Sequence, residues 1–134
     1  MNATITLLPG DGIGPEIVDE ARRVLEAVAI GHDHIFTFQE GLIGGCAIDA
    51  EGTALPEATL SLCLSSDAVL LGAVGGPRWS DPKAAVRPEQ GLLALRKAMG
   101  VFANLRPVQV LDALVDGRPL RAERVRGVDI MIVR

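Results

Sequence analysis

Residues 3–16 read Ala-Thr-Ile-Thr-Leu-Leu-Pro-Gly-Asp-Gly-Ile-Gly-Pro-Glu, and this stretch indicates the fold class. Residues 3–8 are apolar and partly β-branched, which is typical of a strand. A glycine turn follows, and Pro15 is well placed to begin a helix that we expect to end near Ala29. Helical periodicity predicts an inward stripe of Ile17, Ala21, Leu25 and Val28. A strand, a tight turn and a helix in this order predict an α/β fold.

The glycine spacing in this turn argues against a Rossmann dinucleotide site. The dinucleotide fingerprint is G-x-G-x-x-G, whereas residues 10–15 follow the pattern G-x-G-x-G-P. Two interpretations of the turn stay open. Either its glycines let the backbone approach a ligand while the helix-start N–H groups favour an anion, or the turn is simply tight and holds no ligand.

The rest of the chain also alternates between extended and helical patterns. Consecutive glycines after an apolar run at 68–71 mark a crevice where backbone can meet a ligand. Leu60, Cys63 and Leu64 share the inward face of a further helix. We expect strands at 35–38, 68–71 and 128–133, a helix at 56–65, turns at 41–45 and 49–52, and an extended segment at 101–111.

A second informative stretch is Arg-Pro-Glu-Gln-Gly-Leu-Leu-Ala-Leu-Arg-Lys, residues 87–97. Pro88 suits a first helical residue and Gly100 suits a helix stop, so we expect a helix from Pro88 to about Met99. The competing interpretation is an ordinary amphipathic helix with surface charges. One face of this helix, about 100° wide, carries Glu89, Leu92, Leu93 and Arg96.

Two further arginines stand at the ends of apolar runs. Arg106 follows residues 101–105, and Arg134 follows residues 128–133. A guanidinium at a strand end can bind both oxygens of a carboxylate, whereas a solvated arginine has no need of that setting. Together with Arg96, these residues suggest a pocket for a small polycarboxylate. The sequence alone does not show that the three side chains converge.

Composition excludes several classes of protein. The chain has 134 residues, of which 49% are hydrophobic, and a net charge of −4, which is typical of a globular protein rather than a disordered one. The acidic balance argues against nucleic-acid binding, and neither a membrane-spanning run nor a signal peptide is visible. We expect Cys46 and Cys63 to be small buried residues in a reducing cytoplasm.

Three other patterns favour a structural or solvent-exposed role over a functional site. His32 and His34 have H-x-H spacing without a third metal ligand nearby, so we expect them to be solvated. Asp112 and Asp116 stand four residues apart beside a Gly-Arg-Pro sequence, which predicts a turn and a helix fragment rather than a metal site. A basic run is predicted to be a solvated face and consists of Arg118, Arg121, Arg124 and Arg126.

Four ordered blocks of the sequence resemble the N-terminal part of the isocitrate/isopropylmalate dehydrogenase family. The blocks are residues 8–16, 72–79, 87–97 and 104–108, and residues 127–134 resemble the strand that leads into the family's next motif. The resemblance implies an α/β fold, here an incomplete αβα sandwich that is not a Rossmann fold. It also implies two parts: 1–100 as the N-terminal part of the cofactor-side domain, and 101–134 as the truncated start of the substrate and dimerisation domain.

The resemblance implies roles for individual residues. Arg96, Arg106 and Arg134 match the family's substrate arginines, while Leu92 and Leu93 offer an apolar surface suited to an isopropyl group. Glu89 matches a residue near the nicotinamide. The full implied cofactor set is Ile13, Gly76, Pro77, Arg78, Trp79, Arg87 and Glu89.

The implied reaction is NAD-dependent oxidative decarboxylation of 3-isopropylmalate to 4-methyl-2-oxopentanoate in leucine biosynthesis. It implies Mg²⁺ or Mn²⁺ as well as a cytoplasmic homodimer. The chain contains no tyrosine and matches neither the family's catalytic lysine nor its metal aspartates, so we expect no catalytic or metal-binding residue in it. The residues present do not separate NAD from NADP. The alternatives are a dehydrogenase of tartrate, malate, homoisocitrate or isocitrate, and a non-catalytic anion-binding module.

We predict that the purified 134-residue chain does not turn over 3-isopropylmalate with NAD and Mg²⁺, because it lacks the groups that would move protons and hold the metal. NADH formation followed by absorbance measures this. Turnover above the no-protein rate would contradict the prediction.

Overall fold

The computed structural model describes residues 1–111, 113, 115 and 121–134 of the chain. They form two compact units, Met1–Val101 and Phe102–Arg134. The predicted boundary, after residue 100, lies one residue before this division. The predicted turn at Asp112 and Asp116 falls outside the described residues. No helix within the described ranges combines the length and the apolar character needed to span a membrane.

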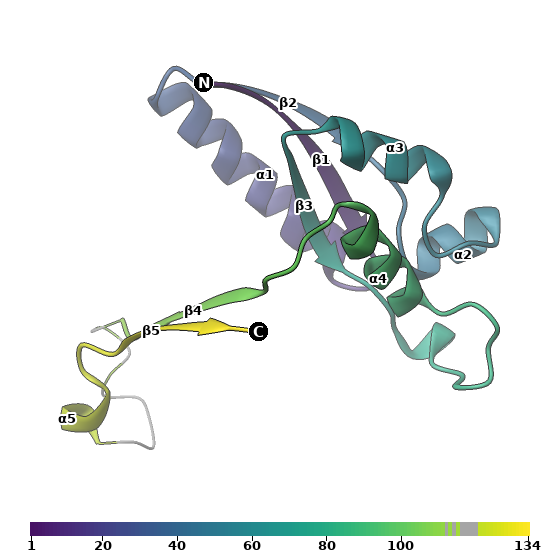
Figure 1. The fold of residues 1–134 in the computed structure, drawn as a ribbon. Helices are drawn as coiled ribbons and strands as arrows, with labels where there is room; N and C mark the ends of the chain where they lie inside the picture. Colours follow the sequence, from purple (N-terminus) through teal and green to yellow (C-terminus); the bar gives the residue numbers. More distant parts are fainter. Residues whose placement is uncertain (112, 114, 116–120) are drawn as a thin grey trace. The chain divides into compact units, whose positions relative to one another are not determined.

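Three parallel strands form the centre of the first unit (Figure 1). β1 (Asn2–Gly10) lies between β2 (Ile35–Glu40) and β3 (Ala68–Ala73). α1 (Gly14–Gly31) covers one face of this sheet. The opposite face carries α2 (Gly45–Glu51), α3 (Glu57–Ser65) and α4 (Pro88–Ala98). This layering confirms the expected incomplete αβα sandwich.

β1 is the central strand because its side chains are buried on both faces of the sheet. Ile5 and Leu7 pack against Val18 of α1. Leu8 points to the opposite face, where it belongs to a buried cluster with Leu95 of α4. A near-continuous apolar run, rather than an alternating one, is what such a strand requires.

The inward face of α1 is rotated from the predicted one. Of the predicted stripe, Leu25 packs against the buried cluster of Ile5, Leu7 and Val18 as expected. Ile17 and Val28, which were also predicted to face inward, are 47% and 41% exposed, whereas Val18 and Ala29 are buried. Two apolar rows lie side by side on this helix, and helical periodicity does not say which of them packs against the sheet. The row that includes Gly14 packs inward because only glycine fits where the helix meets the backbone of the strands.

Two other local predictions are wrong. Leu64 of α3 is 56% exposed, although Cys63 is buried as expected. The segments 41–45 and 49–52, which were predicted as turns, flank and partly form the helix α2. Because α2 has only seven residues and is bordered by glycines, its sequence locally has the composition of a turn.

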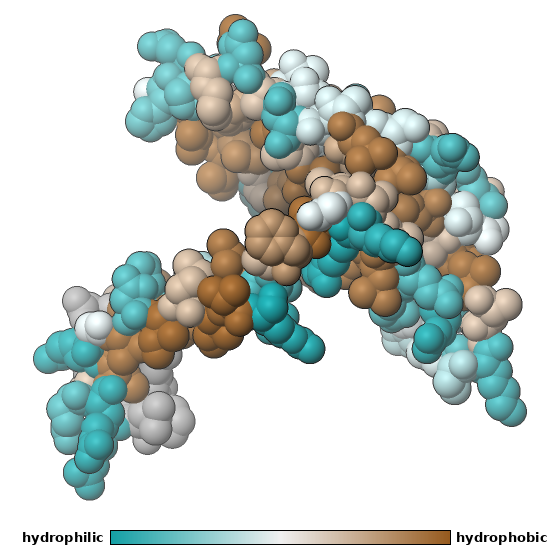
Figure 2. All heavy atoms as spheres, in the orientation of Figure 1, coloured by the Kyte–Doolittle hydropathy of each residue, from teal (hydrophilic) through white to brown (hydrophobic). Residues whose placement is uncertain are grey.

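The second unit is a two-stranded antiparallel ribbon with a short helix. β4 (Leu105–Gln109) pairs with β5 (Asp129–Val133), and α5 (Ala122–Val125) precedes β5. These strands confirm the predicted extended segment and the predicted strand at 128–133. Apolar side chains on the ribbon are exposed, and brown atoms follow its length in Figure 2. A ribbon of two strands cannot bury both of its faces by itself.

We predict that Leu8→Ala lowers the free energy of unfolding by about 2–5 kcal/mol, because it opens a cavity in a fully buried cluster. Leu64→Ala removes the same atoms from an exposed position and should cost less than about 1 kcal/mol. Urea unfolding followed by the fluorescence of Trp79, the only tryptophan, measures both values. Equal losses in the two variants would contradict the orientation of α3.

Candidate functional site

A buried carboxylate joins three loops at the carboxyl ends of the strands. Asp11 follows β1 and is only 3% exposed. Its Oδ2 accepts hydrogen bonds from the backbone N–H groups of Gly45 and Gly75, and its Oδ1 accepts one from Cys46, each at 2.7 Å. In a sheet of order β2-β1-β3, the switch point where ligands bind lies between β1 and β3. At this point three N–H groups that suit an anion are taken by the chain's own carboxylate.

The glycine turn between β1 and α1 serves backbone packing. A Cβ at Gly10 would overlap the carbonyl oxygen of Ala73, and a Cβ at Gly14 would overlap that of Pro9. Gly10 also has a φ of +70°, which favours glycine. Gly10 and Gly14 are therefore explained by a tight turn that holds no ligand, which is one of the two interpretations of this stretch. Gly12, with a φ of +59°, borders open space.

The loop after β3 is docked on α2 through Trp79. This residue ends a short 3₁₀ helix, η1 (Pro77–Trp79), and its indole lies over Gly45, where a Cβ would overlap the ring. Trp79 Nε1–H donates to Asp49 Oδ1 at 3.2 Å, and Arg78 forms a 3.0 Å ion pair with Asp49 Oδ2. The Arg78 guanidinium also lies 5.5 Å from the indole centroid. The predicted cofactor residues of η1 are therefore held against α2.

A small pocket next to η1 brings three predicted cofactor residues together, namely Trp79, Arg87 and Glu89. Its volume is about 290 Å³, and its walls are formed by Trp79, Ser80, Pro82, Arg87 and Glu89. Glu89 also reaches the loop after β3, because its Oε1 lies 3.0 Å from the position of a Cβ on Gly75. Ile13, exposed at the start of α1, does not line this pocket. An indole, a carboxylate and a guanidinium around one pocket suit a flat polar heterocycle.

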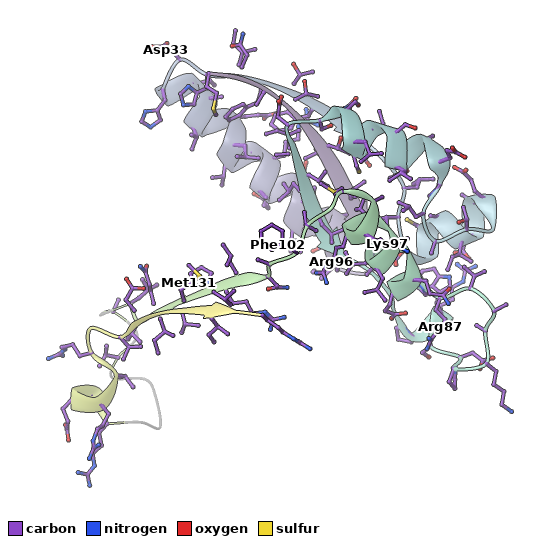
Figure 3. The ribbon with its side chains drawn as sticks, viewed as in Figure 1. Asp33, Arg87, Arg96, Lys97, Phe102 and Met131 are labelled. Atoms are coloured by element: carbon purple, nitrogen blue, oxygen red, sulfur yellow. The ribbon has the colours of Figure 1, made fainter. Side chains whose placement is uncertain are left out.

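α4 presents a mixed apolar and cationic face to solvent. Glu89 and Arg96 are exposed, Leu93 is 63% exposed, and Leu92 is half-buried. Figure 3 shows Arg96 on α4 and Arg87 at the residue that precedes the helix. The predicted face is therefore open to a ligand, with Leu92 at its border with the core. The helix buries its other side through Pro88, Gly91 and Leu95.

Arg106 and Arg134 lie on one face of the ribbon in the second unit. The backbone groups of Arg134 and Asn104 exchange two hydrogen bonds, at 2.9 and 3.0 Å. Arg106 stands two residues beyond Asn104, so the two arginines point to the same side of the ribbon. Arg106 Nε–H also donates to Asn104 Oδ1 at 3.1 Å. Arg96 belongs to the first unit, and the convergence of all three stays a prediction.

The remaining titratable candidates contribute little to a site. Cys46 and Cys63 are free thiols, and burial raises the pKa of both, which keeps them protonated near neutral pH. Cys63 is buried as expected, whereas Cys46 is half-buried. The ring of His34 stacks on that of His32. Across the described part of the chain, no group of three or more His, Cys, Asp or Glu side chains is placed to hold a metal ion.

Sequence reasoning missed Asp11, Gly45 and Asp49 as parts of the site. The local signal for Asp11 is an acidic residue between two glycines at the end of a buried strand. Gly45 and Asp49 had no such signal, because α2 was not predicted and their partners are 30 or more residues away.

A family model described as isocitrate/isopropylmalate dehydrogenase matches residues 4–134. Two curated relatives, both described as 3-isopropylmalate dehydrogenase, are 65% identical (Anaeromyxobacter dehalogenans, over 134 residues) and 59% identical (Geobacillus kaustophilus, over 133 residues). These alignments cover 100% and 99% of this chain but only 38% and 36% of the relatives. The chain thus spans less than two fifths of the length of these relatives.

Solved structures of dehydrogenases are also similar to this chain. A β-decarboxylating dehydrogenase from Thermococcus kodakarensis matches with a TM-score of 0.68 and 34% identity, over 98% of this chain and 33% of that structure. Isocitrate dehydrogenase from Methylococcus capsulatus matches with a TM-score of 0.63 and 31% identity, over 97% and 33%. Sequence and fold therefore agree that this chain belongs to the isocitrate/isopropylmalate dehydrogenase family.

Proposed function

We propose that the protein carrying this chain is an NAD-dependent 3-isopropylmalate dehydrogenase, which oxidises and decarboxylates 3-isopropylmalate to 4-methyl-2-oxopentanoate. The observation that carries the proposal is the exposed face of α4, where Leu93 stands beside Arg96. The names of relatives up to 65% identical support the same choice. The proposal includes a role in leucine biosynthesis, a cytoplasmic location and a homodimeric enzyme.

The α4 face suits a substrate with one apolar branch and carboxylates. Arg96 would bind a carboxylate in a bidentate manner, and the adjacent Leu92 and Leu93 would cover the isopropyl group. Burying that group on leucines is favourable by roughly 1–2 kcal/mol. Burying an unpaired third carboxylate there would cost more, which disfavours isocitrate. Arg106 and Arg134 complete the proposed set of carboxylate ligands.

The pocket beside η1 is the proposed place of the nicotinamide. Its walls combine the indole of Trp79 with the charged groups of Arg87 and Glu89, and its volume of about 290 Å³ accepts a single ring. The loop residues 76–78 would line the approach to this pocket, and Ile13 would contact another part of the cofactor. These residues would bind and orient NAD and exclude water from the reacting carbon.

A divalent cation, Mg²⁺ or Mn²⁺, would polarise the carbonyl formed by oxidation and stabilise the enolate left by loss of CO₂. The family resemblance matched no residue of this chain to the cation's ligands, so we propose none here. The family resemblance likewise matched none of its residues to the groups that move protons. The chain's own contribution is therefore to bind the substrate and to orient the cofactor.

We predict that Leu93→Ser, in the complete protein that carries this chain, raises the KM for 3-isopropylmalate by about tenfold, because a polar group replaces apolar surface beside the isopropyl group. The KM for malate, which lacks that group, should change less than about twofold. Initial rates of NADH formation with both acids measure the difference.

Ala94→Ser is the matched control, since Ala94 is an exposed neighbour on α4 outside the predicted face. It should leave both KM values unchanged. An equal effect of Leu93→Ser on both acids, or a wild-type preference for tartrate, malate, homoisocitrate or isocitrate, would contradict the proposed substrate.

A further inference from the structure

We propose that α2 is a dock that positions the nicotinamide-side loop, with Gly45 and Asp49 holding Trp79 and Arg78, and with Asp11 pinning the same loop at Gly75. This inference rests on the proposed function, because it assigns the docked loop to the cofactor. It assigns a role to Gly45, Asp49 and Asp11, for which neither the sequence patterns nor the family resemblance indicated one.

The first element of the dock is the contact between the indole and the helix backbone. Gly45 opens α2, and its missing side chain leaves the space that the six-membered ring of Trp79 occupies. Gly45 has an ordinary negative φ, so an alanine would suit its backbone but would overlap the indole. The glycine is therefore required by its neighbour rather than by its own conformation.

The second element is the carboxylate of Asp49, one turn further along α2. Its two oxygens take separate partners, Trp79 Nε1–H and the Arg78 guanidinium. The ion pair alone is weak, because the Arg78 side chain is 72% exposed and screened by water. The indole hydrogen bond and the packing on Gly45 add to it, and together they fix the ring in position and in rotation.

The third element is the buried carboxylate of Asp11, which is bonded both to the start of α2 and to the loop. Its Oδ2 accepts from the N–H groups of both Gly45 and Gly75 at 2.7 Å, so the start of α2 and the loop after β3 share one acceptor. The carboxylate of Glu89 also lies next to Gly75, with its Oε1 3.0 Å from the position of a Cβ there. The loop that carries Trp79 is thereby held to the start of α2 through the shared Asp11 carboxylate.

The loop depends on this dock because it has little structure of its own. η1 contains only three residues, and a 3₁₀ turn of that length is not stable by itself. Its position in front of Arg87 and Glu89 therefore comes from contacts with α2. A loop held in the bound conformation loses less entropy when the cofactor binds, so its release should weaken cofactor binding more than it slows the chemical step.

The test uses Asp49→Ala and Gly45→Ala in the complete protein that carries this chain. Asp49→Ala removes the hydrogen bond to Trp79 and the ion pair with Arg78. Gly45→Ala displaces the indole without any change in charge. We expect each to raise the KM for NAD by roughly tenfold while kcat falls less than threefold. In the 134-residue chain, where Trp79 is the only tryptophan, its emission should shift to longer wavelength and become more accessible to acrylamide in both variants.

Two matched controls accompany these variants. Gly31→Ala places the same methyl group on a helix where a Cβ meets open space, and Glu51→Ala removes an exposed carboxylate from α2 itself. Both should leave the KM for NAD and the Trp79 emission unchanged. A lower melting temperature without a change in KM would show a merely structural contact and would overturn the inference.

The outcomes separate the dock from the proposed function. Unchanged Trp79 emission in both variants overturns the dock, and shifted emission with an unchanged KM for the dinucleotide overturns the positioning role. If the wild-type protein uses NADP instead of NAD, the proposed cofactor is wrong, and the KM for NADP tests the inference. If the wild type uses neither, the proposed function and the positioning role both fail, while the emission still tests the dock.

Discussion

The arrangement of the first unit depends on one buried carboxylate. Asp11 receives three backbone N–H groups at 2.7 Å from segments that are 34 to 64 residues away in the sequence. A carboxylate with 3% exposure is costly to bury unless charge-assisted hydrogen bonds replace its water. Because those bonds come from both the start of α2 and the loop after β3, these two segments and the turn after β1 cannot move independently. The same carboxylate occupies the N–H groups at the carboxyl ends of β1 and β3, and the proposed cofactor pocket lies beside η1 and the start of α4.

The two faces of α4 have different roles, since one packs in the core and the other is exposed to solvent. Gly91 lies so close to the Ala54 backbone that a Cβ would overlap its carbonyl oxygen, and this close approach keeps Leu95 in the core. The opposite face is thereby directed to solvent, with Leu93 and Arg96 exposed. An exposed leucine beside an arginine is unfavourable as surface but suitable as one wall of a binding site. In the proposed function this wall meets the substrate, and the docked Trp79 meets the cofactor.

Most elements could be predicted from the sequence because their signals are local. The strands of the first unit, the helices α3 and α4, and the mixed face of α4 follow from short apolar runs, prolines at helix starts and helical periodicity. The errors have a common cause. Ile17 was predicted to face inward although its apolar neighbour Val18 is the buried residue, and Leu64 was predicted to face inward together with Cys63, which alone is buried. Where neighbouring residues are all apolar, periodicity does not fix the exact direction in which the helix faces the sheet. The glycine-bordered helix α2 was missed because its local composition is that of a turn.

The sequence by itself determined most of the strands and helices but not α2, together with the non-Rossmann glycine turn and the family, because each of these is encoded in contiguous residues. Only the tertiary structure decided that Asp11 occupies the crevice at the strand ends, that Trp79 lies on Gly45, and which row of α1 is buried. These outcomes depend on contacts between segments far apart in the chain. Several arrangements are compatible with the local sequence, and close packing between distant segments decides which of them forms. A local sequence pattern does not encode those contacts.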